Sequence, residues 1–283
     1  MIRKLTVLLA LAFLALPGSA FAQAGYFGDA GNSFVQNVGP GQVNWQTMKL
    51  RVTGSGAPNP NAPNIAVARL GAERAAKADA FRNALESVQG VQVSAESTVQ
   101  DFMLQSDTIK TRVEGTLRGF SVVDRKYFND GGVEIVIEVT LTGDIAAALF
   151  GDQAFAAAPG ADNMAAAQAQ GPVYTGLIID ASGLGSKPAM SPRIIDERGA
   201  EVYGTGVASR EFALDLGVVG YARDAEKAKV NDRVSDNALV IKAIKTDGPA
   251  GTNLVISNAD AEMIRNVTQN LSFLSKCRVM IVL

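Results

Sequence analysis

The 283-residue chain contains no histidine, and this absence excludes several kinds of chemistry. A Ser-His-Asp triad, a His-ligated metal and most general acid–base schemes depend on an imidazole. Cysteine is almost as scarce: Cys277 is the only one, so an intramolecular disulfide is excluded and no imidazole can activate its thiol. We therefore predict that the protein is not an enzyme, with no catalytic residue, no cofactor and no metal ligand.

Charge is also sparse and balanced, because 26 Lys and Arg stand against 28 Asp and Glu without a long run of either sign. Binding to nucleic acid or to an anionic membrane surface depends on concentrated Lys and Arg. We therefore expect no nucleic-acid partner, and no segment of the sequence is polybasic enough to favour a membrane.

Long apolar runs are missing except near the start of the chain. Arg3 and Lys4 precede an uncharged run from Leu5 to Leu16, and Ala20-Phe21-Ala22 follows it. A basic start, an apolar core shorter than the roughly 20 residues of a membrane span, and an A-x-A exit are typical of a secretory signal. We predict that residues 1–22 are a cleaved signal peptide and that no transmembrane span remains after cleavage.

The mature chain would then begin at Gln23, which places it in the periplasm or, alternatively, among secreted proteins. Lipid anchoring at this end requires a cysteine directly after the cleavage site, so we expect that the protein is not a lipoprotein. Residues 23–43 are rich in Gly and Asn, a composition typical of a flexible N-terminal arm.

Residues 44–150 have the patterns of a small α+β domain. Met48, Leu50 and Val52 alternate with polar residues, which indicates a strand. A long helix is predicted from the N-cap Asn64 to Gly90, where we expect a left-handed residue. The larger apolar residues of this helix share one side and are predicted to face the core: Val67, Leu70, Ala78, Phe81, Leu85 and Val88.

Further elements are predicted in the same domain. Alternation at Val91–Ala95 indicates a second strand, and apolar spacing of four behind Asp107 indicates a short helix capped by this residue. The runs Phe120–Phe128 and Val133–Thr142 flank Asn129-Asp130-Gly131-Gly132, which has the composition of a hairpin turn. Together these elements predict one antiparallel sheet that carries one long helix.

Three stretches of this domain resemble a known family: AFRNALESVQGVQV, which ends at Val93, SDTIKTRVEGTLRGFSVV at Ser106–Val123, and VEIVIEVTLT at Val133–Thr142. The family is that of small bacterial envelope lipoproteins (Lpp-twenty type), which includes the flagellar basal-disk protein FlgP. Its fold is similar to the N-terminal domain of the flagellar-ring protein FlgT. The resemblance covers about residues 47–149. It implies a non-enzymatic protein at the periplasmic side of the outer membrane that assembles into rings or sheets.

Residues 151–172 are rich in Ala, Gly and Gln and are predicted to be a linker. Residues 173–283 then have the patterns of a second α+β domain, with a helix behind a capping box at Ser257 and Asp260 and a buried last strand in CRVMIVL. We expect each domain to hold an antiparallel or mixed sheet packed against one long helix. Short strands are expected at 173–179, 193–196, 201–203, 238–244 and 253–256, with a short helix between Ser209 and Gly217.

A few carboxylates invite a functional interpretation, and each also has a more ordinary one. Glu134 and Glu138 share one face of a strand about 13 Å apart, which exceeds the roughly 5 to 9.5 Å of a glycosidase pair. Asp180, Asp196 and Asp215 follow or interrupt apolar segments, but no second metal ligand stands at a fixed spacing from them. Turn and cap roles are therefore expected for these three aspartates.

Two functions remain open at this point. The first is a structural envelope protein that self-associates and contacts other cell-envelope or flagellar proteins, for example in a flagellar basal disk or ring. The second is an envelope binding module, in which one domain recognises a partner protein, a lipoprotein or a wall polymer.

Overall fold

The first half of the chain folds around one antiparallel sheet, as seen in a computed structural model that describes residues 34–151, 155, 174–267 and 272–283. The predicted signal peptide, the start of the predicted arm and most of the predicted linker lie outside these residues. The strand order is β1-β2-β3-β5-β4. The strands are β1 (Val35–Val38), β2 (Gly41–Asn44), β3 (Lys49–Gly56), β4 (Ser121–Tyr127) and β5 (Val133–Thr140).

The strands predicted from alternation, which correspond to β3, β4 and β5, are confirmed. Leu50 and Val52 are fully buried, as are Ile135 and Ile137 on the inward face of β5. The predicted turn between β4 and β5 is also confirmed, because Gly131 has a φ of 86° and its N–H donates to the carbonyl oxygen of Phe128.

The prediction of a flexible arm is wrong for its last part, where β1 and β2 form a hairpin. Gly39, with a φ of 55°, makes the turn between the two strands. The hairpin leads into Trp45, which is 1% exposed and lies edge-on against Tyr221 with ring centroids 5.7 Å apart. Because Tyr221 belongs to the second half of the chain, local composition could not reveal what orders this segment.

The long helix α1 (Ile65–Gln89) begins where predicted, since the Asn64 side chain accepts a hydrogen bond from the N–H of Val67. Its core-facing side differs from the prediction. Alanines at four-residue spacing are fully buried on β3 and its neighbours. Of the residues predicted to face the core, Val88 is fully buried, Phe81 and Leu85 are partly buried, and Val67, Leu70 and Ala78 are exposed. The buried alanines are Ala72, Ala76, Ala80 and Ala84.

Two glycines of β3 explain this choice of face. A Cβ on Gly54 would lie 2.1 Å from the backbone nitrogen of Ala80, and one on Gly56 would lie 2.0 Å from the carbonyl oxygen of Ala72. The helix backbone therefore rests directly on the strand backbone, and only residues as small as alanine fit between them. Val67 and Leu70 consequently remain 45% and 57% exposed.

Three shorter helices complete the first half: α2 (Val99–Gln105), α3 (Asp107–Arg118) and α4 (Asp144–Phe150). A capping box of Thr98 and Asp101 starts α2. The predicted helix at Asp107 is confirmed, but its N-cap is Ser106, whose hydroxyl accepts from the N–H of Ile109. Phe81 and Leu85 of α1 are half-buried and pack on this side of the core.

Two other local predictions are wrong. Gly90, at the end of α1, has a right-handed φ of −79° instead of a left-handed one. Val91–Ala95 forms an isolated bridge and not a strand. The carbonyl oxygens of Val93 and Ala95 accept hydrogen bonds from Ser191 and Ala250 in the second half, so this segment serves as a strap between the halves.

The second half contains two four-stranded sheets, which is one more than predicted. The first is wholly parallel, and the second is mixed. The parallel sheet has the order β10-β6-β13-β9, with β6 (Gly176–Asp180), β9 (Gly220–Ala222), β10 (Ala238–Lys242) and β13 (Val279–Val282). The mixed sheet has the order β11-β12-β7-β8, with β7 (Ile194–Asp196), β8 (Glu201–Tyr203), β11 (Lys245–Asp247) and β12 (Asn253–Ile256).

The α+β fold class is thus confirmed, and so is the buried last strand, since β13 lies between β6 and β9. Ser257 caps α7 as predicted: its hydroxyl accepts from the N–H of Asp260 at 3.0 Å and donates to the Asp260 carboxylate at 2.6 Å. The helices of this half are α5 (Arg210–Leu216), α6 (Ala225–Lys229), α7 (Asn258–Val267) and α8 (Ser272–Ser275).

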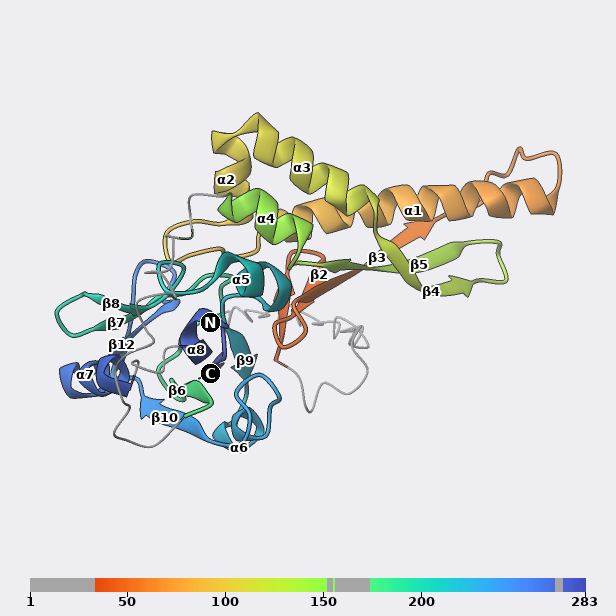
Figure 1. The fold of residues 1–283 in the computed structure, drawn as a ribbon. Helices are drawn as coiled ribbons and strands as arrows, with labels where there is room; N and C mark the ends of the chain where they lie inside the picture. Colours follow the sequence, from red (N-terminus) through yellow and green to blue (C-terminus); the bar gives the residue numbers. More distant parts are fainter. Residues whose placement is uncertain (1–33, 152–154, 156–173, 268–271) are drawn as a thin grey trace, which may run out of the picture.

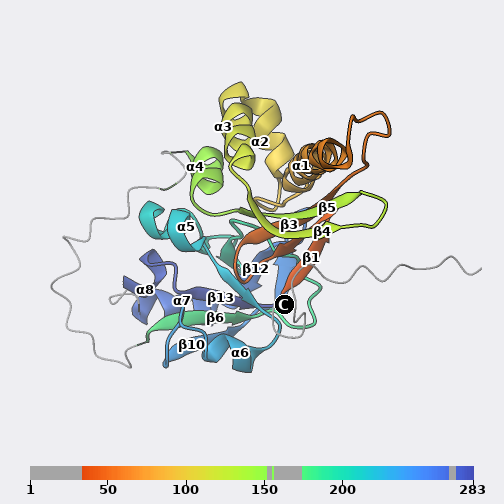
Figure 2. The same cartoon turned by 90° about the vertical axis from the view of Figure 1, so that its right-hand side faces the viewer.

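The two halves pack against each other, and most of their buried apolar residues belong to one continuous core. One part of the molecule stands clear of this core. Figure 1 shows that the first half of α1 and the hairpin of β4 and β5 project together to one side, far from the second half. Figure 2, seen from that side, places the two turns at the end of this projection next to each other. We call residues 57–77 and 123–134 the distal arm.

Candidate functional site: the distal arm and the pocket at its base

The distal arm exposes large apolar side chains that the fold does not bury. On α1, Ile65 is 73% exposed, and Val67 and Leu70 are exposed on another side of the helix. On the hairpin, Tyr127 and Phe128 are about half exposed, at 51% and 48%. A cluster of exposed apolar side chains at the end of a projection is typical of a contact surface.

The apolar row of α1 is the same row that the sequence predicts to face the core. Its second half, at Phe81 and Leu85, packs towards the core beside α2 and α3. Its first half has no such cover, because α1 reaches beyond α3 (Figure 1). The helix therefore has two apolar sides: the alanines bind the sheet, and the larger residues are covered only near the base of the arm.

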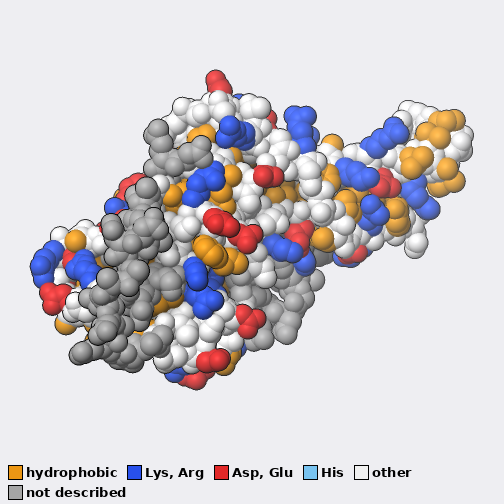
Figure 3. Space-filling model, in the orientation of Figure 1, with side chains coloured by type: hydrophobic (Ala, Val, Ile, Leu, Met, Phe, Trp, Pro, Cys, Tyr) orange, Lys and Arg blue, Asp and Glu red, His pale blue; other side chains and the backbone are white. Residues whose placement is uncertain are grey.

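Cations surround the apolar end. The guanidinium carbon of Arg69 lies 5.7 Å from the centre of the Tyr127 ring, which links α1 to β4. Arg74, Arg125 and Lys126 are exposed on the two elements behind it. Figure 3 shows this arrangement, with hydrophobic side chains gathered at the end of the arm and Lys and Arg set back along it.

The acidic groups of the arm are largely engaged. The Glu73 carboxylate pairs with Lys77 at 2.9 Å and lies 3.8 Å from Arg125. A hydrogen bond from Lys77 lowers the pKa of Glu73, so this carboxylate stays ionised and neutralises part of the basic charge. Glu134 pairs with Lys126 at 3.3 Å. The sequence hides this cluster, because its cations come from segments more than 50 residues apart.

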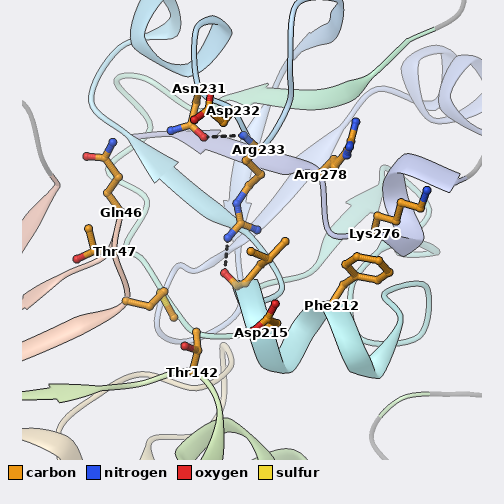
Figure 4. A pocket seen from close by; sticks show the side chains of 12 residues that line it. Gln46, Thr47, Thr142, Phe212, Asp215, Asn231, Asp232, Arg233, Lys276 and Arg278 are labelled. Carbon is orange, nitrogen blue, oxygen red and sulfur yellow. Dashed lines mark hydrogen bonds between the residues drawn. The ribbon is translucent and has the colours of Figure 1, made fainter.

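A pocket of about 460 Å³ lies at the base of the arm, where the two halves meet (Figure 4). Gln46 and Thr47 line it from the first half, and Phe212, Lys276 and Arg278 line it from the second half. The side chains in Figure 4 come from several loops and from α5 and do not converge on one point. Asp215 and Asp232 also line the pocket, so acidic and basic groups are mixed there.

Arg233 occupies the centre of this pocket in Figure 4, and both of its terminal nitrogens are engaged by backbone carbonyl groups. Its guanidinium donates to the carbonyl oxygens of Leu216, Gly217 and Cys277. Leu216 and Gly217 end α5, so the cation satisfies carbonyl groups that a helix terminus leaves without partners. Burial lowers the pKa of Arg233 from its usual value. Arg233 therefore links the end of α5 to the segment at Cys277.

The candidate nucleophile Cys277 has no features of a reactive thiol. Its side chain is fully buried, and burial raises its pKa to about 11. The hydroxyl of its neighbour Tyr203 donates to the carbonyl oxygen of Val218 at 2.6 Å. Burial likewise raises the pKa of Tyr203. Only a small fraction of such a thiol is ionised at neutral pH.

The three aspartates considered as metal ligands lie apart in the fold. Asp196 is 2% exposed, and its carboxylate accepts from the N–H groups of Ala200 and Arg198 and from Arg265. Asp180 accepts from the N–H of Ser182. Hydrogen bonds from Ala200 and from Ser182 lower the pKa of Asp196 and Asp180, respectively. Asp215 lines the pocket at the base of the arm.

These placements fit the turn roles expected for Asp180 and Asp196. The part of the chain that the structure describes contains no group of three or more residues of the metal-ligating types. The same part contains no helix that is both long and apolar enough to cross a membrane.

The two glutamates of β5 also have structural partners. Glu138 binds Lys49 and Arg51 of the neighbouring strand β3, both at 2.7 Å. Burial raises the pKa of Glu138, but the hydrogen bonds from both cations outweigh it, and the net effect is a lowered pKa. Glu134 binds Lys126 in the arm. Neither carboxylate faces the other across a pocket.

The fold and these sites define a two-part α+β protein whose distinctive feature is the exposed surface of the distal arm. Residues 49–140 match the family model described as LPP20 lipoprotein. Residues 176–283 match a second family model, described as Treponema pallidum Tp0624, second domain. Comparison with curated proteins gives no match.

The first match confirms the family resemblance predicted from the sequence, and it includes the whole distal arm. The similarity to FlgT stays a prediction. The matched family is one of lipoproteins, which points against the expectation that this chain is not a lipoprotein. The only cysteine in the sequence is Cys277, and its side chain is buried in the second half.

Proposed function

We propose that the protein is a non-enzymatic structural or assembly protein of the cell envelope, periplasmic or associated with the outer membrane, that self-associates. The observation that carries this proposal is the distal arm, which exposes large apolar side chains. A surface of this kind is used by binding a partner. The LPP20 match supports the envelope location.

Size-exclusion chromatography with light scattering on the mature chain tests the self-association. We expect a molar mass that is a multiple of the monomer and that falls on dilution. A mass equal to one chain at every concentration would count against self-association.

We propose the flagellar basal disk or ring as the specific assembly to test, because the family resemblance includes FlgP. Purification of basal bodies from wild-type cells, followed by immunoblotting for this protein, tests the assignment. Co-purification with the basal body would support it. Recovery in envelope fractions that contain no basal bodies would remove the flagellar part and leave the envelope part intact.

The second candidate function is an envelope binding module, and the pocket of about 460 Å³ between the halves favours it. A pocket lined from both halves would couple ligand binding to their packing. Pull-down from envelope fractions distinguishes the two proposals. One stoichiometric partner, recovered with a monomeric protein, would favour the binding module.

A further inference from the structure

We infer that the end of the distal arm inserts into the surface of an anionic lipid membrane. This inference rests on the envelope location in the proposed function, and it names what the apolar end of the arm contacts. It takes the arm as the contact with the envelope, and light scattering tests self-association separately.

The end of the arm carries apolar groups and almost no charge. The loop at residues 57–64 contains three prolines and no charged residue. Ile65 follows it at the start of α1, and Phe128 lies at the adjacent turn of the hairpin. Apolar groups of this size enter the boundary between lipid headgroups and acyl chains to a depth of about 5–10 Å.

The cations lie at the depth where headgroups would be. Arg69 is four residues beyond Ile65, which corresponds to about 6 Å along a helix. Lys126 is two residues before Phe128, which corresponds to about 7 Å along a strand. Both distances agree with the insertion depth, so the cations would meet lipid phosphates while the apolar end is buried. Tyr127, between them, has the amphipathic ring that membrane interfaces favour.

The charge of the arm favours an anionic surface. Among its exposed charged residues, Arg69, Arg74, Arg125 and Lys126 are basic, and the last two pair with Glu73 and Glu134. Two exposed aspartates oppose them. Each accepts a hydrogen bond from a nearby backbone N–H, Asp124 from Arg125 and Asp130 from Gly132. An acidic protein surface would also complement these cations, but the end in front of them, which carries apolar groups and the single charge of Asp130, fits a lipid layer better.

Co-sedimentation of the mature chain with vesicles tests the inference. The anionic vesicles contain equal parts of phosphatidylglycerol and phosphatidylethanolamine, and the neutral vesicles contain phosphatidylcholine alone. We expect binding at least tenfold stronger to the anionic vesicles. Most of it should be lost in 1 M salt, where the Debye length falls to about 3 Å.

Two substitutions with matched controls assign the binding to the arm. Ile65→Asp with Phe128→Asp should weaken vesicle binding at least tenfold, because carboxylates replace the inserted groups. Asp suits the first turn of a helix, so α1 should remain folded. Leu104→Asp makes the same kind of change at a 78% exposed residue of α2 and should leave binding unchanged.

The charge is tested separately. Arg69→Gln with Lys126→Gln should weaken binding to the anionic vesicles about tenfold and leave binding to neutral vesicles unchanged. Lys242→Gln with Lys245→Gln, which removes two exposed cations of the second half, is the matched control. Near-ultraviolet circular dichroism of each variant establishes that the fold is retained.

Equal binding of the wild type and of the arm variants to vesicles would overturn the inference, as would a complete lack of vesicle binding. Loss of vesicle binding together with intact oligomers in light scattering would leave the proposed self-association standing. A folded arm variant that no longer forms oligomers, in a protein that ignores vesicles, would show that a second copy covers the arm instead.

Discussion

At the scale of single residues, Gly54 and Gly56 determine the geometry of the first half. They let α1 lie on β3 at backbone contact, and this contact selects alanine for the buried side of the helix. The larger apolar residues near the start of the helix, Val67 and Leu70, are then left exposed. Two residues without side chains are therefore the reason that the protein has an exposed apolar row.

Substitution of Gly54 by alanine tests this statement. The added Cβ would lie 2.1 Å from the backbone nitrogen of Ala80, so strand and helix must move apart, and we expect a loss of about 2–4 kcal/mol in the free energy of unfolding. Gly71→Ala is the matched control. Gly71 lies on the outer side of α1 with no atom near its added Cβ, and alanine there should stabilise the helix by about 1 kcal/mol. Urea denaturation of both variants measures the difference, and equal effects would contradict the packing argument.

The ion pairs of Glu138 predict a pH dependence. Lys49 and Arg51 lower the pKa of Glu138 in the folded state below its usual value of 4.5. Its contribution to stability is therefore present above that value and is lost as the pH falls through the folded pKa. We expect Glu138→Gln to cost about 1 kcal/mol at pH 7 and almost nothing in strong acid.

Urea titrations at several pH values check this expectation for Glu138. Glu134→Gln is the control, because that carboxylate is paired with one exposed lysine and should contribute little at any pH. A cost for Glu138→Gln that stays constant from pH 7 into strong acid would show that the charge of the carboxylate is not what stabilises the strands.

At the scale of elements, the sequence pattern predicts where α1 begins and how long it is, but not which of its sides is buried. Its existence, its start at Asn64 and its length follow from periodicity and capping. Which of its two apolar sides is buried depends on the space above β3, and that space is a property of Gly54 and Gly56 in another element. By hydrophobic size alone, Val67 and Leu70 would be buried against the sheet. The close contact between the helix and strand backbones leaves room only for the alanines.

The two halves of the larger apolar row should respond differently to truncation. Phe81→Ala should destabilise the protein by about 1–3 kcal/mol, because Phe81 packs against the buried core near the base of the arm. Leu70→Ala should change the free energy of unfolding by less than about 0.5 kcal/mol, because its side chain is 57% exposed. Denaturant unfolding of the isolated monomer checks both values. A similar loss at both positions would mean that the arm is covered within one chain.

At the scale of the whole molecule, the sequence predicts two α+β regions, and the structure adds how they are joined. The strap at Val91–Ala95, the contact between Trp45 and Tyr221, and the hydrogen bond from Gly143 to Leu214 all connect residues more than 50 positions apart. The parallel pairing of β6 with β13 spans about 100 residues. Periodicity reports only on local structure, so these features could not be predicted from it.

The distal arm is predicted only in part. Its elements are predicted correctly, and its apolar residues are recognised, but they are assigned to the core. Its cations are dispersed in the sequence and meet only when α1 and β4 come together at Arg69 and Tyr127. A charge cluster of this kind is a property of the folded surface, which explains why the sequence shows no basic patch.

The most direct test of the account is the accessibility of the arm in the cell envelope. Cys277 is buried and its pKa is raised to about 11, so a single cysteine introduced by Leu70→Cys can be labelled selectively with a maleimide. Leu104→Cys on α2 is the control. We predict that Leu70→Cys reacts rapidly in the purified monomer and is at least tenfold protected in envelope preparations, whereas Leu104→Cys reacts equally in both. Equal labelling of Leu70→Cys in both preparations would contradict the claim that this protein acts through its arm.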